Sequence, residues 1–268
     1  MRPARCPVRS GRAGALHPFR TDTRMDSIPA TRRTAIFLRH ETLTHDMGSF
    51  VFQTRDPAAF VPGQFAMLDL PDVEGDRAYS MANLPNDEGL WEFIIKEQPG
   101  GDGSVALFDA FPPGTELALD GPHGEAVLNR EAIDRPIVCI GGGAGISQLI
   151  SILRGAQADP TLNRNPMTLF YGGRRPDDIC APRLLQRAGL ADTVACVTAV
   201  SEPTADDDWQ GPTGLITDVL HRHLATWPDP SNCEYYFCGP TPMTDAVQQV
   251  LCRGFAVPES QQHFDSFG

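Results

Sequence analysis

The chain is poor in positive charge and contains no long apolar run. Its 268 residues include 22 Lys and Arg against 34 Asp and Glu, giving a formal net charge of −12. A phosphate-binding surface normally needs a basic excess or stripe, so this balance argues against nucleic acid as a partner. The longest apolar region, residues 137–153, is interrupted by glycines, Ser147 and Gln148. It therefore falls short of the roughly 18 apolar residues of a membrane helix, and we expect no membrane association.

The cysteines have no spacing that suits a metal site or a disulfide framework. There are seven of them: Cys6, Cys139, Cys180, Cys196, Cys233, Cys238 and Cys252. An odd, scattered set indicates free thiols in a reducing compartment, and we expect a cytoplasmic protein. No pair has the C-x2-C spacing of a zinc site, and no C-x4-C-x2-C run could hold a plant-type 2Fe–2S cluster. We therefore expect no metal.

Basic residues are concentrated at the N-terminus. Residues 1–24 hold six arginines and one acidic residue, Asp22, so they carry +5 and the remainder carries −12 − 5 = −17. This segment has too little apolar material to fold alone, and we predict a disordered arginine-rich head over residues 1–30. Two alternatives are a transit peptide, which is also arginine-rich and poor in acids, and a true start at Met25.

Short strands with glycine and proline turns dominate residues 31–130. The pattern predicts strands at Thr34–Arg39, Ser49–Gln53, Gln64–Leu70, Ala78–Met81, Trp91–Lys96 and Glu116–Leu119, with one helix at Ser104–Ala110. Many short strands bounded in this way are typical of an antiparallel β-barrel or sandwich. We predict an antiparallel β-barrel domain.

Strands and helices alternate over residues 131–268. Strands are predicted at Ile137–Ile140, Met167–Tyr171, Thr193–Val200 and Tyr235–Cys238, with helices after them up to Arg154 and at Pro182–Ala188, Leu215–Leu224 and Thr241–Arg253. This alternation indicates an α/β domain with a parallel sheet, which binds ligands beyond the carboxyl ends of its strands.

Two motifs in the first half suit a phosphate and a planar ring. In Arg77-Ala78-Tyr79-Ser80, strand alternation places Arg77 and Tyr79 on one face and Ser80 on the other. Arginine offers a fork to phosphate, and a tyrosine ring offers a flat surface. The second motif contains Gly101, Gly103 and Ser104, whose backbone N–H groups would face an anion at a helix start. Taken alone, the first motif also fits an ordinary amphipathic strand, and the second also fits a loop followed by a helix cap.

Two further motifs lie at predicted strand ends in the second half. The run Gly141-Gly142-Gly143-Ala144-Gly145 follows a buried strand and opens a helix, as in a pyrophosphate-binding turn, although its spacing is not G-x-G-x-x-G. Cys238-Gly239-Pro240 with Met243 also follows a strand and precedes a helix. A lone cysteine is usually a small buried hydrophobe, so the order of all four motifs carries the argument.

This succession of motifs resembles the ferredoxin–NADP reductase superfamily over residues 34–267, particularly the FAD/NAD(P)H reductase components of bacterial multicomponent oxygenases. The resemblance implies that Arg77, Gly101, Gly103 and Ser104 bind the FAD phosphates. Tyr79, flanked by Ala78, would pack on the isoalloxazine, and Ser80 would hydrogen-bond near flavin N5. The resemblance also implies a nicotinamide nucleotide site at Gly142, Gly143, Ala144, Gly145, Gly239, Pro240 and Met243. Cys238, Asp265 and Phe267 would lie close to the two rings, with Ser80, Cys238 and Asp265 as the catalytic residues.

The chain departs from the family pattern at two points. Many members have proline at the position of Gln148, where proline suits the first turn of a helix. Many oxygenase reductases also carry a four-cysteine ferredoxin domain, for which this sequence has no cysteine run. We therefore expect electrons to pass singly to a separate ferredoxin or oxygenase component.

NADH is the expected hydride donor, with NADPH less favoured. Residues 201–209, after the third predicted parallel strand, contain four acids and no base, which disfavours a 2′-phosphate. Arg174 and Arg175, after the second strand, oppose this preference.

Three other functions remain open at this point. The electron-transfer subunit of dihydroorotate dehydrogenase has the same fold but carries a cysteine cluster that this chain lacks. A free flavin or ferric reductase would need no protein partner. A non-catalytic flavin-binding module would need no nicotinamide site. We expect a monomer, although no motif reports the oligomeric state.

Overall fold

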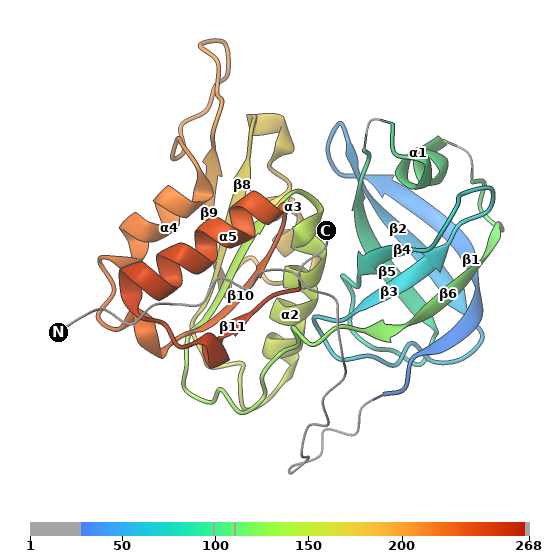
Figure 1. Cartoon of the computed structure of the whole chain (residues 1–268), viewed down its shortest axis with the longest axis horizontal. Helices are drawn as coiled ribbons and strands as arrows, with labels where there is room; N and C mark the ends of the chain where they lie inside the picture. The colour runs from blue at the N-terminus through green and yellow to red at the C-terminus, as the bar shows by residue number, and fades with distance from the viewer. Residues whose placement is uncertain (1–27, 99, 110, 266–268) are drawn as a thin grey trace.

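The computed structural model describes residues 28–98, 100–109 and 111–265. Most of the predicted head, Ser266 and Phe267 lie outside these residues. The described chain forms two halves that pack against each other (Figure 1). Among the described residues, no helix is long and apolar enough to cross a membrane.

The first half is an antiparallel barrel. Its strands are β1 (Thr31–Thr42), β2 (Met47–Thr54), β3 (Phe65–Asp69), β4 (Arg77–Ser80), β5 (Leu90–Lys96) and β6 (Glu116–His123), with helix α1 (Asp102–Asp109). They pair in the order β4-β3-β6-β1-β2-β5. A bridge between Met81 and Phe93 joins the two edges. Alternation along β1 buries Ala35 and Phe37 among aromatic side chains and leaves Ile36 exposed.

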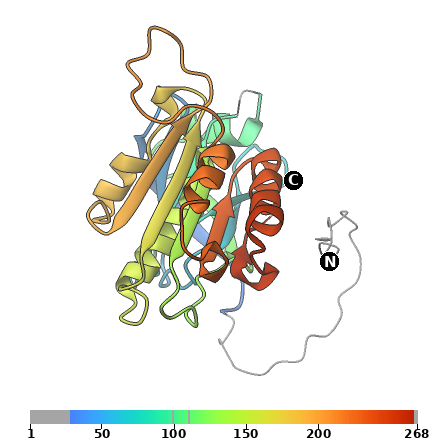
Figure 2. The same cartoon turned by 90° about the vertical axis from the view of Figure 1, so that its left-hand side faces the viewer.

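The second half is a parallel sheet covered by helices. It contains β7 (Ile137–Gly142), α2 (Ile146–Ala158), β8 (Met167–Gly173), α3 (Ala181–Arg187), β9 (Val194–Val200), α4 (Ile216–Leu224), β10 (Glu234–Cys238), α5 (Thr241–Gln249) and β11 (Gln262–His263). Strand β7 is buried on both faces: Ile137 and Cys139 pack with α2 and α3, whereas Val138 and Ile140 pack with α4 and α5. Figure 2 shows the helices on either side of the sheet.

The strand order, β11-β10-β7-β8-β9, creates a switch point between β7 and β10. The chain leaves β7 toward β8 on one side, and β10 is added on the other side. In sheets of this kind, ligands bind in the crevice outside the carboxyl ends of the two strands at the switch point. Helix α2 begins there and packs against both the sheet and the barrel, because its core cluster also includes Met47 and Ile94.

The predicted architecture is confirmed, with two local differences. Strand β11 was not predicted, because two polar residues give no strand pattern; they pair with Tyr235 and Tyr236 only after the C-terminal segment has folded back. The last predicted helix changes to a π-helix over Val250–Gly254.

Candidate functional site

The glycine turn after β7 packs directly on the end of β10. A Cβ atom at Gly145 would lie 2.1 Å from the carbonyl oxygen of Cys238 and 2.8 Å from the nitrogen of Gly239. Only glycine allows this approach of two backbones. Gly143 has a φ of +54°, which also favours glycine. The turn therefore has both the conformation and the contacts that its glycines predicted.

Met243 borders the same crevice from α5. A Cβ at Gly142 would lie 3.1 Å from its Sδ, and a Cβ at Gly239 would lie 2.6 Å from its Cε. Pro240 is exposed at the start of this helix, and Ala144 is half-buried in the turn opposite. The structure thus brings all the predicted nucleotide-binding residues to one edge of the sheet.

The two phosphate motifs of the barrel also meet. A Cβ at Gly103 would lie 3.2 Å from both Cγ and Nε of Arg77, although the two residues are far apart in sequence. The Arg77 guanidinium donates hydrogen bonds to the carbonyl oxygens of Glu74 and Gly75, both at 2.9 Å. The fork is thereby held beside the N-terminus of α1, close to Gly101 and Gly103.

Ser104 has a different local contact from the one that the motif suggests. Its hydroxyl accepts a hydrogen bond from the Gln98 N–H at 2.8 Å and donates to the Gly101 carbonyl at 3.3 Å. The Gly101 N–H donates to the Gln98 carbonyl at 2.8 Å, so Ser104 and Gly101 together fix the turn that places Gly103 at the start of α1.

Tyr79 and Ser80 lie where β4 approaches the second half. Burial raises the pKa of Tyr79 to about 12, although the charge of Arg77 opposes this, so its phenol stays protonated at neutral pH. Its ring is partly buried, 6.3 Å from that of Phe93. The carbonyl of Ser80 accepts a hydrogen bond of 2.6 Å from the hydroxyl of Ser147 on α2. Ser147 also accepts from the Ile94 N–H at 3.0 Å.

The C-terminal segment places Asp265 against the barrel. Phe65 and Asp265 both lie beside Gly124. A Cβ added at Gly124 would be 3.0 Å from the ring of Phe65 and 3.1 Å from Oδ2 of Asp265. Phe65 is the strand partner of Ser80. Oδ2 is buried and has no hydrogen-bond partner among the described residues, as expected for a polar atom that faces a ligand site. Burial raises the pKa of the Asp265 carboxyl, although N–H groups of Glu125 and Ala126 oppose this.

Cys238 is buried at the end of β10, within reach of the charge of Asp265. Burial, followed by the charge of Asp265, raises the pKa of its thiol to about 12. The thiol is therefore neutral at pH 7 and is not a thiolate nucleophile.

Helix α2 supplies polar contacts that the sequence did not reveal. Gln148 donates to the carbonyl oxygens of Gly63 and Ala126 at 3.0 and 3.1 Å, and Ser151 donates to that of Asn83 at 2.8 Å. These side chains join the helix to the barrel. Glutamine at position 148 therefore holds the two halves together, a role that proline could not perform because it has no side-chain donor.

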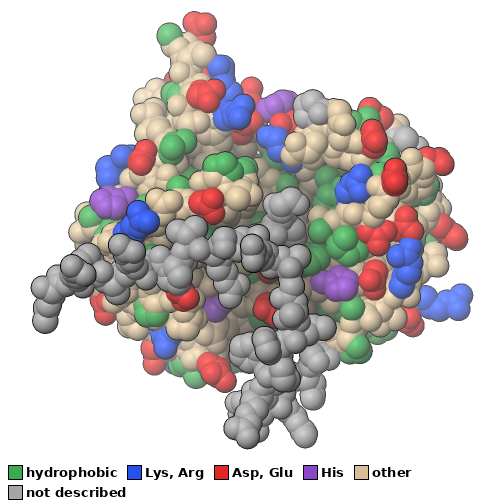
Figure 3. All heavy atoms as spheres, in the orientation of Figure 1, with side chains coloured by type: hydrophobic (Ala, Val, Ile, Leu, Met, Phe, Trp, Pro, Cys, Tyr) green, Lys and Arg blue, Asp and Glu red, His purple; other side chains and the backbone are tan. Residues whose placement is uncertain are grey.

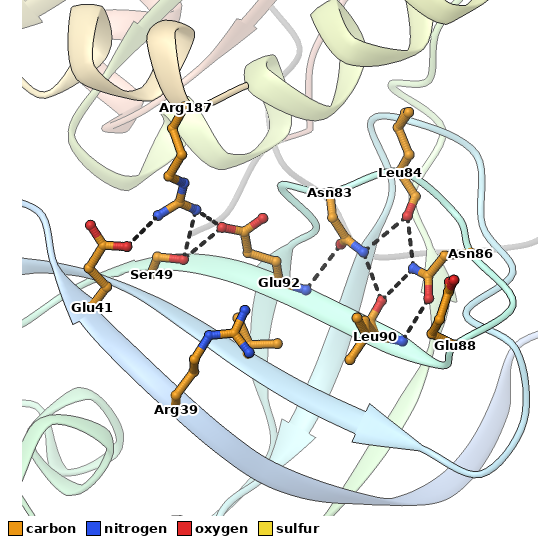
Figure 4. A pocket seen from close by; sticks show the side chains of 11 residues that line it. Arg39, Glu41, Ser49, Asn83, Leu84, Asn86, Glu88, Leu90, Glu92 and Arg187 are labelled. Atoms are coloured by element: carbon orange, nitrogen blue, oxygen red, sulfur yellow. Dashed lines mark hydrogen bonds and ion pairs between the residues drawn. The ribbon is translucent and has the colours of Figure 1, made fainter. Parts of the chain in front are cut away.

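A separate cavity of about 570 Å³ lies between the barrel and α3 (Figure 4). Arg187 points into it and pairs with Glu41 at 3.1 Å and with Glu92. The other lining residues include Arg39, Ser49, Asn83, Asn86 and Glu88. None of the residues predicted to bind a cofactor lines this cavity, and the Arg187 guanidinium is already paired with two of its carboxylates.

Two cofactor-binding halves facing one crevice define a flavin- and nicotinamide-dependent oxidoreductase. Residues 35–127 match the family model of the oxidoreductase FAD-binding domain, and residues 139–249 match that of the oxidoreductase NAD-binding domain. The chain is 42% identical over 248 residues to the ferredoxin–NAD(P)(+) reductase CarAd of Metapseudomonas resinovorans, covering 92% of this chain and 72% of the relative.

Other comparisons agree. The ferredoxin–NAD(+) reductase component of the alkene monooxygenase system of Xanthobacter autotrophicus is 38% identical, covering 89% of this chain and 71% of the relative. The solved ferredoxin reductase in carbazole 1,9a-dioxygenase superposes with a TM-score of 0.81 at 37% identity, covering 90% of this chain and 71% of that one. The chain belongs to this family of ferredoxin reductases and is an NAD(P)H-dependent FAD oxidoreductase.

Proposed function

We propose that the chain takes a hydride from NADH and passes electrons singly to a separate ferredoxin or oxygenase component. The observation that supports this proposal is that Asp265 lies beside Gly124 together with Phe65, the strand partner of Ser80, and that its charge also acts on the Cys238 thiol. FAD, when bound there, would accept the hydride and release single electrons. An acceptor outside the chain is supported by relatives whose names describe reductase components of an alkene monooxygenase system and of a propane 2-monooxygenase.

The residues present suit FAD. Arg77 and the N–H of Gly103 would hold the pyrophosphate, and Gly101 and Ser104 would keep that loop in place. Tyr79 would cover the isoalloxazine, and Ser80 would hydrogen-bond near N5. The unpartnered Oδ2 of Asp265 would face the same ring system, and we extend this assignment to Phe267, which lies outside the described residues.

The nucleotide would lie along Gly142, Gly143, Ala144 and Gly145, with Gly239, Pro240 and Met243 opposite. Cys238 would border the nicotinamide and exclude water from the space between the rings. We also propose the domain division at residues 31–130 and 131–268, a cytoplasmic location, and a monomer.

The test is an anaerobic titration of the purified flavoprotein with NADH and then NADPH, followed by visible absorbance. Bleaching by NADH supports the reductase function, and subsequent oxidation by a 2Fe–2S ferredoxin, faster than by free FMN or ferric citrate, supports a protein acceptor. A yellow protein that neither nucleotide bleaches would favour a binding module. Replacing Ser80 with Ala should slow hydride transfer while FAD stays bound, and unchanged single-turnover kinetics would exclude that role.

A further inference from the structure

Two loops meet above the carboxyl ends of β8 and β9. The N–H of Ser201 donates to the carbonyl of Gly173 at 3.0 Å, and the N–H of Glu202 donates to that of Arg174 at 2.8 Å. The loop from β9 projects beyond the sheet (Figures 1 and 2). It carries acidic side chains, with basic side chains beside its lower part (Figure 3).

The projecting loop holds one of the two arginines at the end of β8. The Arg175 guanidinium lies 3.0 Å from Oδ1 of Asp207 and 3.4 Å from the hydroxyl of Thr204. Oδ2 of Asp207 accepts the Thr204 N–H at 2.6 Å. This backbone hydrogen bond lowers the pKa of Asp207, so the carboxylate is charged at neutral pH.

The far side of the loop is also fixed. The Trp209 indole donates to the carbonyl of Pro212 at 3.0 Å, and the N–H of Gly214 donates to that of Val200 at 3.0 Å. A Cβ at Gly211 would lie 2.5 Å from the Trp209 ring. Asp207 is therefore a counter-ion in an organised loop and not a mobile surface charge.

We propose that Asp207 determines the choice of NADH over NADPH by holding the arginine that would otherwise bind a 2′-phosphate. In a sheet of this strand order, the adenosine ribose lies at the end of the second strand, which is β8, and an arginine there accommodates the 2′-phosphate. The ion pair with Asp207 engages the Arg175 guanidinium. Arg174 makes no ion pair within the described part of the chain, and the facing loop also carries Glu202, Asp206 and Asp208. This inference rests on the proposed function and names a specificity residue within it.

The experiment compares two adenosine fragments that lack nicotinamide, 2′,5′-ADP and 5′-AMP, by calorimetry with the FAD-loaded protein. The wild type should bind 2′,5′-ADP no more tightly than 5′-AMP. Asp207→Asn should tighten 2′,5′-ADP binding about tenfold, the effect of one charge-assisted hydrogen bond, and leave 5′-AMP binding unchanged. The kcat/KM ratio of NADPH to NADH should rise by a similar factor.

Two controls separate this contact from a general loss of negative charge. Asp206→Asn changes the loop charge equally, at an exposed position with no contact to Arg175, and should alter the 2′,5′-ADP to 5′-AMP ratio by less than about twofold. In Arg175→Gln, the effect of Asp207→Asn should disappear. Equal gains in the Asp206 and Asp207 variants, or a gain that persists without Arg175, would overturn the proposal.

Further outcomes also decide the question. A wild type that prefers 2′,5′-ADP, or fragments that bind no variant, would show that Asp207 does not control a ribose site here. Because the fragments carry no hydride, these results are independent of flavin bleaching by NADH. A protein that fails to bleach but shows the predicted fragment selectivity would contradict the reductase function and support this inference.

Discussion

The two halves of the molecule form their candidate cofactor sites in different ways. At Gly145 an added Cβ would meet a backbone carbonyl oxygen at 2.1 Å, whereas at Gly103 it would meet the side chain of Arg77 at 3.2 Å. A side chain can rotate away, but a strand in the middle of a sheet cannot move without disturbing its neighbours. The nucleotide crevice is therefore fixed by the packing of the fold, and the phosphate site of the barrel depends on side chains that can adjust.

The second half is also held together by a buried cluster of charged side chains around Glu234. Glu234 is 0% exposed at the start of β10, and it binds Arg135 at 2.5 Å and His263 at 2.6 Å. Arg135 belongs to the connection between the halves, and His263 lies two residues before Asp265. We expect substitutions at the nucleotide crevice to affect stability and reaction together, and substitutions in the barrel loop to affect FAD affinity alone.

The largest effect is expected for Gly145→Ala. The new methyl group would separate the start of α2 from β10, at an expected cost of about 2–3 kcal/mol in the free energy of unfolding. NADH should then fail to bleach the flavin at wild-type concentrations. Urea denaturation measures the stability, and NADH titration measures the reaction. A variant unchanged in both would contradict the claim that backbone packing at Gly145 fixes the nucleotide crevice.

Glu234→Gln should cost about 2 kcal/mol at pH 7, because charge-assisted hydrogen bonds to Arg135 and His263 are lost. Burial raises the pKa of Glu234, but the contacts from His263 and Arg135 outweigh burial and hold it below the ordinary value of 4.5. The stabilisation is therefore complete above that pH and is lost as the pH falls through the lowered pKa of the folded state.

The stability difference between the wild type and Glu234→Gln should accordingly narrow below pH 4.5, as followed by urea denaturation across pH. The exposed Glu88 offers a matched control, since Glu88→Gln removes the same charge without a described ion pair. A difference independent of pH would argue that the ionised pair does not stabilise the fold.

Ser147→Ala tests the contact between the halves. Loss of its hydroxyl leaves the buried Ser80 carbonyl and Ile94 N–H unpaired, at a cost of about 1–2 kcal/mol. Because Ser80 would then shift, we also expect hydride transfer to slow about tenfold in single-turnover measurements. Ser151→Ala removes a hydroxyl from the same helix that binds Asn83 instead. This control should lose stability but keep the wild-type rate of hydride transfer. Equal rates of hydride transfer in the two variants would mean that Ser147 has only a structural role.

The smallest effect is expected for Gly103→Ala. Arg77 can move aside, so FAD affinity should fall only about three- to tenfold, equivalent to about 0.7–1.4 kcal/mol. The stability of the FAD-free protein should not change. FAD titration of deflavinated protein measures the affinity, and loss of folding in this variant would show that the barrel site is as rigid as the nucleotide crevice.

Local patterns in the sequence were sufficient to predict most of the architecture. The buried run at Ile137–Ile140 predicted a strand covered on both faces, and the glycines after it predicted a close backbone approach. Both signals depend on neighbouring residues, which is why they are readable without a structure. The motif order was also enough to identify the family that the comparisons confirmed.

Other features depended on contacts between distant residues. Ser147 and Gln148 interrupt an apolar run in the sequence and have no local partner that would reveal their contacts, because their partners Ser80 and Gly63 are 67 and 85 residues away. The short strand β11 forms only because β10 offers a free edge. No local pattern can predict such pairings.

The sequence by itself determined the two architectures, the family and the positions of the cofactor motifs, because these follow from hydrophobic periodicity and from backbone requirements of nearby residues. Tertiary structure alone decided that Arg77 meets Gly103, that Asp265 reaches the site of Ser80, and that Asp207 holds Arg175. These contacts join polar side chains across long stretches of chain, and their partners are chosen by how the two halves and their loops pack.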